Sequence, residues 1–264
     1  MKVQVIYFSP TGTTKRVLEG IIEGVKPDRV DFADLRNSQA NKIVKTDSDA
    51  PDLVLIGMPT YVSRIPPEAA AELKKVKGAG IPAVIVAVYG NNKFGDILLE
   101  MKNIANSAGF IPIAAAAFIG EHSFSTDEKP IAHNRPDIAD MKKAKSFGFA
   151  IKKERLNSDA NFADFDLQVP GEFPYREWHR LPAGPPVTDE ELCIKCGKCK
   201  ESCPVDAICI SDTISTNPDT CIFCCACVKN CPTEARKIMD KTLLDIRERL
   251  YGNCQERKEA SIYL

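Results

Sequence analysis

The sequence is short of the features that mark membrane, secreted and nucleic-acid-binding proteins. Its 264 residues carry 35 Lys+Arg against 36 Asp+Glu, and this balance removes the usual electrostatic attraction to nucleic acid or to an anionic membrane. The longest apolar stretches, at 81–88 and 110–119, are shorter than the roughly 20 residues that a membrane span needs. The basic start, apolar core and cleavage site of a secretory signal are lacking. We therefore expect a cytoplasmic protein with no nucleic-acid partner and no membrane span.

Cysteine is absent from the first 192 residues, and all 11 cysteines lie in the remainder. A disulfide framework suits a small secreted chain, which this sequence does not resemble. Cysteines crowded into a short stretch of an intracellular protein indicate metal binding. The distribution predicts a cysteine-free domain followed by a metal domain.

The cysteine-free part alternates apolar, β-branched runs with stretches of helical periodicity. Strands are expected at 3–8, 52–57, 81–88 and 110–116, and helices at 15–25, 66–77, 96–107 and 136–155. Strands that alternate with helices indicate an α/β domain with a mostly parallel sheet covered on both faces. In such a sheet the ligand binds beyond the carboxyl ends of the strands, where the strand order reverses.

The loop after the first strand is rich in hydroxyl groups. Ser9, Thr11, Thr13 and Thr14 surround Gly12 directly before a helix. Hydroxyls, free backbone N–H groups and the positive end of a helix dipole suit a phosphate. The loop has neither the Lys of a Walker motif nor the G-x-G-x-x-G of dinucleotide folds, so neutral donors would hold the phosphate. The alternative is a Ser/Thr-rich N-cap turn with no ligand.

Two further strand-end loops contain aromatic side chains, glycine and polar groups. Their candidate residues are Pro59, Thr60 and Tyr61 in one loop, and Tyr89, Gly90, Asn91, Phe94 and Gly95 in the next. A flat heteroaromatic ring needs apolar faces and polar partners at its edge. Three suitable loops in the right order predict a site for such a ring, although each aromatic alone is more often a packing residue. His122 follows the last strand and is expected to be a polar loop residue in water rather than a proton relay or a contact at the edge of the ring.

The first loop resembles the phosphate loop of the flavodoxin family, Thr/Ser-x-Thr-Gly-x-Thr, here Ser9-Pro10-Thr11-Gly12-Thr13-Thr14. Position 13 is Thr where many flavodoxins have Asn, and Thr60-Tyr61 replaces a frequent Trp in the first ring loop. The resemblance covers about residues 1–150. It implies that the first loop holds the phosphate of FMN and that the 58–63 and 89–95 loops flank its ring, with Tyr61 and Phe94 as ring contacts.

The metal domain contains two copies of C-x2-C-x2-C-x3-C-P, 28 residues apart. This duplication resembles a bacterial two-cluster ferredoxin over about residues 187–238. The resemblance implies one [4Fe–4S] cluster on Cys193, Cys196, Cys199 and Cys231, and a second on Cys221, Cys224, Cys227 and Cys203. The alternative, a pair of structural zinc sites, usually shows separated C-x2-C pairs.

Three cysteines remain outside the two motifs. Cys225 is expected to be a small buried neighbour of the second motif. Cys209 is expected to pack under the first cluster, and Cys254 to be a surface thiol in a charged helix at about 239–258.

The whole chain resembles the flavodoxin–ferredoxin fusion proteins of anaerobic prokaryotes. We expect a flavodoxin-like doubly wound domain at 1–156, a Pro- and aromatic-rich linker at 157–186, a small α+β ferredoxin-like domain at 187–238 and a C-terminal helix within 239–264. The linker is expected to pack along a domain surface or to cover the ring site.

The resemblance implies electron transfer between FMN, two [4Fe–4S] clusters and soluble redox proteins or a redox enzyme. One alternative is a flavin-dependent reductase that acts on a small molecule and receives its electrons from the clusters. The other is a ferredoxin with an empty flavodoxin-like docking domain. No catalytic nucleophile or acid/base pair is predicted.

Overall fold

The computed structural model describes residues 1–37, 49–156, 162 and 165–264 and builds its larger domain on a six-stranded sheet. Its strands are β1 (Lys2–Tyr7), β2 (Arg29–Asp34), β3 (Leu53–Pro59), β4 (Pro82–Tyr89), β5 (Ile111–Ile119) and β10 (Ser261–Tyr263). They lie in the order β10-β5-β4-β3-β1-β2, and every pair is parallel except β10 with β5. The first five strands therefore have the order 2-1-3-4-5 of the flavodoxin-like doubly wound fold.

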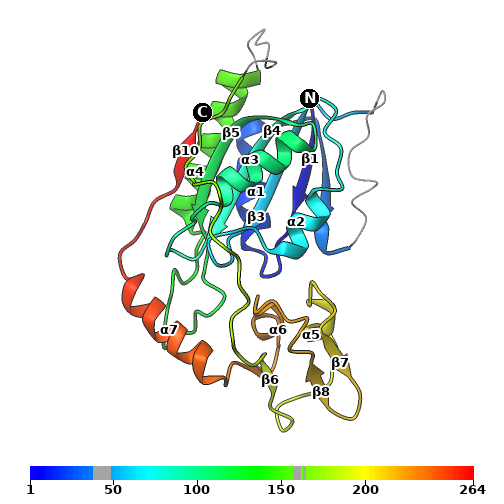
Figure 1. The fold of residues 1–264 in the computed structure, drawn as a ribbon, viewed down its shortest axis with the longest axis vertical. Helices are drawn as coiled ribbons and strands as arrows, with labels where there is room; N and C mark the ends of the chain where they lie inside the picture. Colours follow the sequence, from blue (N-terminus) through cyan, green and yellow to red (C-terminus); the bar gives the residue numbers. More distant parts are fainter. Residues whose placement is uncertain (38–48, 157–161, 163–164) are drawn as a thin grey trace.

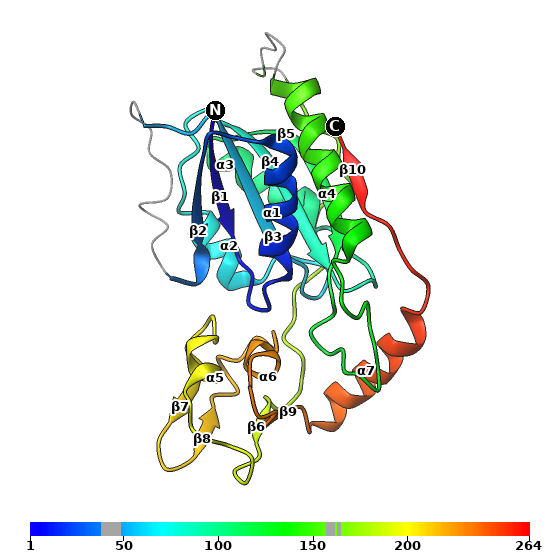
Figure 2. The ribbon, with the colours of Figure 1, turned by 180° about the vertical axis from the view of Figure 1, so that it is seen from behind.

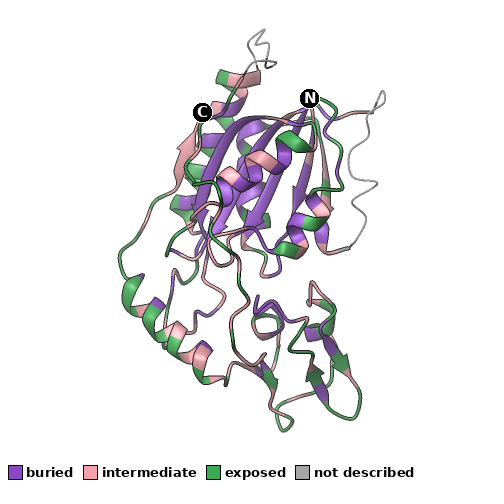
Figure 3. Cartoon of the chain, viewed as in Figure 1, coloured by how far each residue is buried: buried purple, intermediate pink, exposed green. Residues whose placement is uncertain are grey.

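Helices cover both faces of this sheet (Figures 1 and 2). On one face lie α1 (Thr13–Val25) and α4 (Ile138–Ile151), and on the other lie α2 (Pro67–Leu73) and α3 (Ile97–Ser107). Strand β3 is buried along its whole length, and β4 along all but its first residue, as expected for parallel strands with helices on both sides. Figure 3 shows this buried centre between the helical layers.

The four expected strands and four expected helices of this domain are confirmed, with ends that differ by a few residues. Strand β2 was not predicted, because charged residues interrupt its apolar ones at an edge of the sheet. The last helix of the domain changes from α4 to a π-helical turn, Lys152–Leu156. The predicted linker falls partly on residues outside the described ranges.

The smaller domain repeats one structural unit. It consists of β6 (Val187–Thr188), α5 (Lys198–Glu201), β7 (Ile208–Ile210), β8 (Ile214–Thr216), α6 (Ala226–Lys229) and β9 (Arg236–Lys237). Antiparallel pairs form between β6 and β9 and between β7 and β8. Left-handed backbone recurs 28 positions apart, with φ of 81° at Gly197 and 57° at Cys225. The duplication in the sequence is therefore also a duplication of backbone geometry.

The smaller domain lies beyond the carboxyl ends of the parallel strands (Figure 1). Ile222, Cys224 and Ala226 belong to the same apolar cluster as the buried residues of α2 and α3, so the two domains share a continuous core. In the described ranges, no helix combines the length and the apolar character needed to cross a membrane.

The C-terminal part runs back from the smaller domain to the sheet. The helix expected at about 239–258 is α7 (Lys241–Asn253). Its N-cap is Asp240, whose carboxylate accepts hydrogen bonds from the N–H groups of Thr242 and Leu243. Beyond α7 the chain continues to β10, which the sequence analysis did not predict. This strand pairs antiparallel with the edge strand β5.

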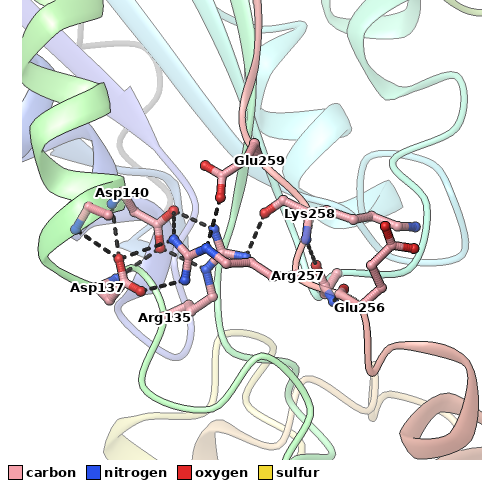
Figure 4. A network of polar contacts seen from close by, with 9 residues as sticks. Arg135, Asp137, Asp140, Glu256, Arg257, Lys258 and Glu259 are labelled. Carbon is pink, nitrogen blue, oxygen red and sulfur yellow. Dashed lines mark hydrogen bonds and ion pairs between the residues drawn. The ribbon is translucent and has the colours of Figure 1, made fainter.

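A charged network holds the segment between α7 and β10 against the larger domain (Figure 4). Arg135 binds Asp140 with two nitrogen atoms and donates from Nη1 to the carbonyl of Lys258 at 2.8 Å. Arg257 Nη1 donates to Oδ2 of Asp137, the N-cap of α4, at 2.6 Å. This segment is therefore fixed by several polar contacts rather than by the short strand alone.

Candidate cofactor sites

The hydroxyl-rich loop is a preformed cradle at the start of α1. Ser9 Oγ accepts a hydrogen bond from the N–H of Lys15 at 3.1 Å, and the N–H of Gly12 donates to the carbonyl of Ser9 at 3.2 Å. Gly12 has a φ of 85°, and a Cβ added there would meet no atom within 4 Å. The loop therefore turns toward open space rather than toward protein.

Donors in this cradle are left for a ligand. Thr14 is 1% exposed, and its Oγ1 has no hydrogen-bond partner among the described residues. The N–H groups of Thr13 and Thr14 lie in the first turn of α1, where an α-helix provides no partner. A buried hydroxyl without a partner is unfavourable, so these groups fit an anion such as the phosphate of FMN.

A cavity of about 530 Å³ opens beside the cradle, a size in the usual range for small-molecule sites. Seven of the predicted cofactor residues line it: Thr11, Thr13, Pro59, Thr60, Tyr61, Tyr89 and Gly90. The Oγ1 atom of Thr60 is buried there without a partner among the described residues. The cavity thus joins the phosphate cradle to the two loops expected to flank a ring.

The loop at Tyr61 is a tight, strained turn. Its N–H donates to the carbonyl of Arg64 at 2.9 Å, and the reverse bond measures 3.0 Å. Between these residues Val62 and Ser63 have φ values of 52° and 66°, which are unusual for residues other than glycine and especially for a β-branched one. Backbone strain of this kind occurs often at ligand sites.

An ion pair anchors the strained turn to α3. Arg64 donates from Nε and Nη2 to the two carboxylate oxygens of Glu100, both at 2.7 Å. Glu100 also accepts from the N–H of Ile65 at 3.1 Å, and the guanidinium lies 4.5 Å from the ring centroid of Tyr175 in the linker. The turn is therefore held from two sides.

Tyr61 links this wall to the cysteine-rich domain. Burial raises the pKa of its phenol well above the usual value, and the neighbouring thiols of Cys224 and Cys225 raise this pKa further. The phenol therefore stays neutral and lies close to the second cysteine motif.

His122 lies in the wall of the cavity, so the expectation of a histidine in open water is wrong. Its Nδ1 accepts a hydrogen bond from the N–H of Phe124 at 3.0 Å, which leaves Nε2 as the protonated nitrogen of the neutral ring. Burial, with a smaller contribution from Lys229, lowers the imidazole pKa to about 4. A Cβ at Gly90 would lie 2.3 Å from the histidine ring, so only glycine permits this packing.

The other predicted loop residues lie away from the cavity wall. Asn91 is 3% exposed, and its amide binds the C-terminal segment instead. Phe94 packs against Tyr89 at 5.4 Å between ring centroids. Gly95 has a φ of 60° and approaches Ser63 closely, so it supports the strained turn.

The far wall of the cavity was not predicted residue by residue. It comes from the linker at 176–181, from Ile222 and Phe223 in the second cysteine motif, and from Ile246, Arg249, Leu250 and Asn253 of α7. The alternative in which the linker covers the ring site thus agrees with the structure. No local pattern marks these residues as part of the cavity wall, because only the tertiary fold brings them to the cavity.

The first cysteine site combines thiols from both motifs. Cys193, Cys196 and Cys199 line a small cavity together with Cys231. Cys203, the fourth cysteine of the first motif, is not among its lining residues. This arrangement resembles the exchange of the fourth cysteine in two-cluster ferredoxins.

The second site lies deeper in the protein. Burial raises the pKa of the Cys224 thiol, and the nearby thiols of Cys227, Cys221 and Cys203 raise it further, which places these four sulfur atoms in one electrostatic neighbourhood. In the described ranges, no three Cys, His, Asp or Glu side chains lie close enough to hold a single metal ion. In the sequence, two C-x2-C-x2-C-x3-C-P runs fit iron–sulfur clusters better than structural zinc sites, which usually show separated C-x2-C pairs.

The remaining cysteines differ in their surroundings. Cys225 is 2% exposed, which confirms the expected buried neighbour. Cys209 is exposed on β7, so the expectation that it packs under a cluster is wrong. Because side chains alternate along a strand, Ile208 faces inward and Cys209 outward. Cys254 is 6% exposed and therefore not a surface thiol.

Comparison with known families identifies the smaller domain. Residues 186–209 and 214–237 match the family described as "4Fe-4S binding domain". The chain combines a flavodoxin-like domain with a ferredoxin-type 4Fe-4S binding domain. The strand order of the sheet identifies the flavodoxin-like domain, and the two matches, one over each cysteine motif, identify the ferredoxin-type domain.

Solved structures with a similar larger domain include a flavodoxin from the domain Archaea and Flavodoxin 1 from Bacillus cereus. They are 15% and 14% identical over 58% of this chain and 97% and 99% of theirs, with TM-scores of 0.41 and 0.42. The flavodiiron protein from Giardia intestinalis is 18% identical, with a TM-score of 0.39, over 58% of this chain and 35% of that one.

One curated protein matches in sequence, the aspartate carbamoyltransferase catalytic subunit of Vibrio vulnificus (strain CMCP6). It is 26% identical over 115 residues. The match spans 44% of this chain and only 37% of the length of that relative.

Proposed function

We propose that this protein transfers electrons between one bound FMN and two [4Fe–4S] clusters within a single chain. One observation supports this proposal most directly. Ile222 and Phe223, which lie between the proposed cluster ligands Cys221 and Cys224, line the same cavity as Thr60 and Tyr61. The second cluster site and the flavin site thus share a wall.

In this proposal the 9–14 loop holds the FMN phosphate through neutral donors, and the strand-end loops at 59–61 and 89–90 contact the ring. Thr14 Oγ1 and Thr60 Oγ1 supply hydrogen-bonding groups that lack partners among the described residues. Bound FMN supplies a centre that exchanges one or two electrons, whereas each [4Fe–4S] cluster exchanges one.

We assign the cluster ligands as two sets of four. Cys193, Cys196, Cys199 and Cys231 form the outer set, in which Cys196 is exposed. Cys203, Cys221, Cys224 and Cys227 form the inner set, in which Cys221, Cys224 and Cys227 are buried. The outer site is therefore the point of exchange with soluble redox proteins, and the inner site passes electrons to the flavin.

The test is an anaerobic absorbance spectrum combined with quantification of released flavin and iron. We expect about one FMN and eight iron atoms per chain, as two four-iron clusters require. Gly12→Asp should remove the flavin and leave the iron, because the new carboxylate enters the phosphate site. Cys196→Ala should lower the iron content and leave the flavin. Iron without flavin, even after FMN is added, would contradict the flavin site and favour a docking domain.

A second function is favoured by the charge of the cavity. Lys93, Arg176, Arg180 and Arg249 line it, whereas Glu121 is the one acidic residue in the described lining and is paired with Lys229 at 2.6 Å. This excess of positive charge suits a small anionic substrate reduced at the flavin. Oxidation of reduced flavin that depends on added small carboxylates carrying a reducible bond would support the reductase. If no such oxidation occurs while electron transfer remains active, the result would support the electron carrier and contradict the reductase.

A further inference from the structure

Arg236 occupies a special position in the smaller domain. It is the residue of β9 that pairs with Thr188 of β6. The equivalent pair in the other half is Ile208 of β7 with Thr216 of β8. Each member of one pair lies 28 positions from its counterpart in the other. Arginine in the second repeat thus replaces an isoleucine of the first.

The guanidinium of Arg236 bridges the two equivalent threonines. Nη1 donates to Thr188 Oγ1 at 2.6 Å, and Nη2 donates to Thr216 Oγ1 at 2.6 Å. The 28-residue repeat that relates the two strand pairs makes these two threonines equivalent. A group bound equally to both therefore lies between the two halves of the domain.

Its charge faces both sites. Arg236 lines the cavity of the outer set, together with Cys193 and Cys199. Its Nη2 also lies 3.9 Å from Cys227 Sγ of the inner set. Arg236 therefore lies beside proposed ligands of both sets.

The charge is buried without a carboxylate partner in the described structure. Arg236 is 3% exposed, and its recorded oxygen partners are two hydroxyls and the carbonyl of Pro186. Its Nε is buried and has no partner among the described residues. An arginine keeps its positive charge, and a buried charge without an opposite charge is strongly unfavourable. The site therefore requires negative charge that the neighbouring side chains do not supply unless the thiols are ionised.

We infer that Arg236 is a shared counter-charge for both [4Fe–4S] clusters and raises the reduction potential of each. The inference rests on the proposed cluster ligands. A cluster with its four thiolates becomes more negative when it accepts an electron, so a fixed positive charge in a low-dielectric interior favours the reduced form. Because the guanidinium lies between the sites, its removal affects both clusters.

The experiment is a redox titration of the anaerobically purified full chain, followed by electron paramagnetic resonance. Iron is quantified first, and eight iron atoms in the wild-type protein establish the clusters independently of Arg236. In Arg236→Met we expect the reduction equilibrium of each cluster to become at least tenfold less favourable. For a one-electron couple, this change corresponds to a potential about 59 mV lower.

Two variants serve as controls. Lys237→Met removes the next positive charge, which is half-exposed and paired with Asp189, and should leave both potentials unchanged. Arg236→Lys keeps a charge and should restore part of the shift in at least one cluster, an effect that a purely structural role would not produce.

Two results would overturn the inference. One is a fully loaded Arg236→Met protein with unchanged potentials, and the other is a shift confined to one cluster. If the methionine variant does not assemble clusters, Thr188→Val replaces it. This change removes the Thr188 hydroxyl that anchors the guanidinium and keeps the charge, so the reduction potentials of the two clusters should shift by unequal amounts. Two unchanged potentials would refute the shared role of Arg236.

Discussion

The side-chain amide of Asn91 is bound to the backbone of Cys254, 163 positions further along the chain. Asn91 Nδ2 donates to the carbonyls of Cys254 at 3.0 Å and Glu256 at 2.8 Å, and its Oδ1 accepts from the N–H of Lys258 at 3.2 Å. The loop expected to contact a flavin ring thus also holds the C-terminal segment.

Asn91→Ala should therefore destabilise the protein rather than release flavin. Three hydrogen bonds of a buried side chain are lost, so we expect the free energy of unfolding to fall by about 3 kcal/mol. Urea denaturation measures the loss, and hydrogen exchange should increase at residues 254–263. Asn92→Ala at the exposed neighbour is the control. Loss of flavin with unchanged stability would restore Asn91 as a cofactor contact.

Removal of Arg64 should leave a buried carboxylate unpaired. Arg64 and Glu100 have side chains that are 16% and 8% exposed, and breaking a buried pair from one side costs about 3–5 kcal/mol. We expect Arg64→Met to lower the free energy of unfolding by the smaller of these values, because the arginine is partly solvated. Arg29→Met, at an exposed ion pair, should cost less than about 1 kcal/mol. Equal effects of the two changes would contradict the role of Arg64 as an anchor.

The neutral His122 should make stability fall in mild acid. Its pKa is about 4 in the folded protein against a usual value of 6.5, so the unfolded chain binds the proton more tightly. The contribution of the neutral imidazole to the free energy of unfolding is then fully present above pH 6.5. It declines as the pH falls toward 4, by about 3 kcal/mol at most. His122→Gln should flatten this dependence between pH 5 and 7 relative to the wild type, measured by urea denaturation under anaerobic conditions. Parallel curves for the two proteins would show that His122 does not titrate in this way.

The adjacent cysteines Cys224 and Cys225 should differ in their effect on iron. Cys225 has a φ of 57°, where the first repeat has Gly197, and its Sγ donates to the carbonyl of Phe223 at 3.5 Å. This contact points its thiol away from a ligand role. We expect Cys225→Ala to keep all the iron and Cys224→Ala to lose iron, by colorimetric iron assay. Iron loss in the Cys225 variant would assign it to a cluster.

Local patterns predicted the features that depend on neighbours in sequence. The hydroxyls around Gly12 and the regular spacing of the cysteines are local, and the alternation of apolar runs led to the parallel sheet. Cys209 and Cys254 were misjudged because burial depends on which face of a strand or helix end meets another domain. Arg236 gave no signal, since its meaning depends on Thr188 and Thr216, which only folding brings together.

The antiparallel pairing of β10 with β5 makes the ferredoxin-type domain an insertion in the flavodoxin-like sheet rather than an appendage to it. The chain enters this domain through the linker and returns through α7, so two covalent tethers fix it over the cavity. A doubly tethered module has a high effective concentration at its binding face. Under the proposed function, electrons would therefore pass between the flavin site and the cluster sites without a diffusional search, because chain connectivity already holds the two domains together.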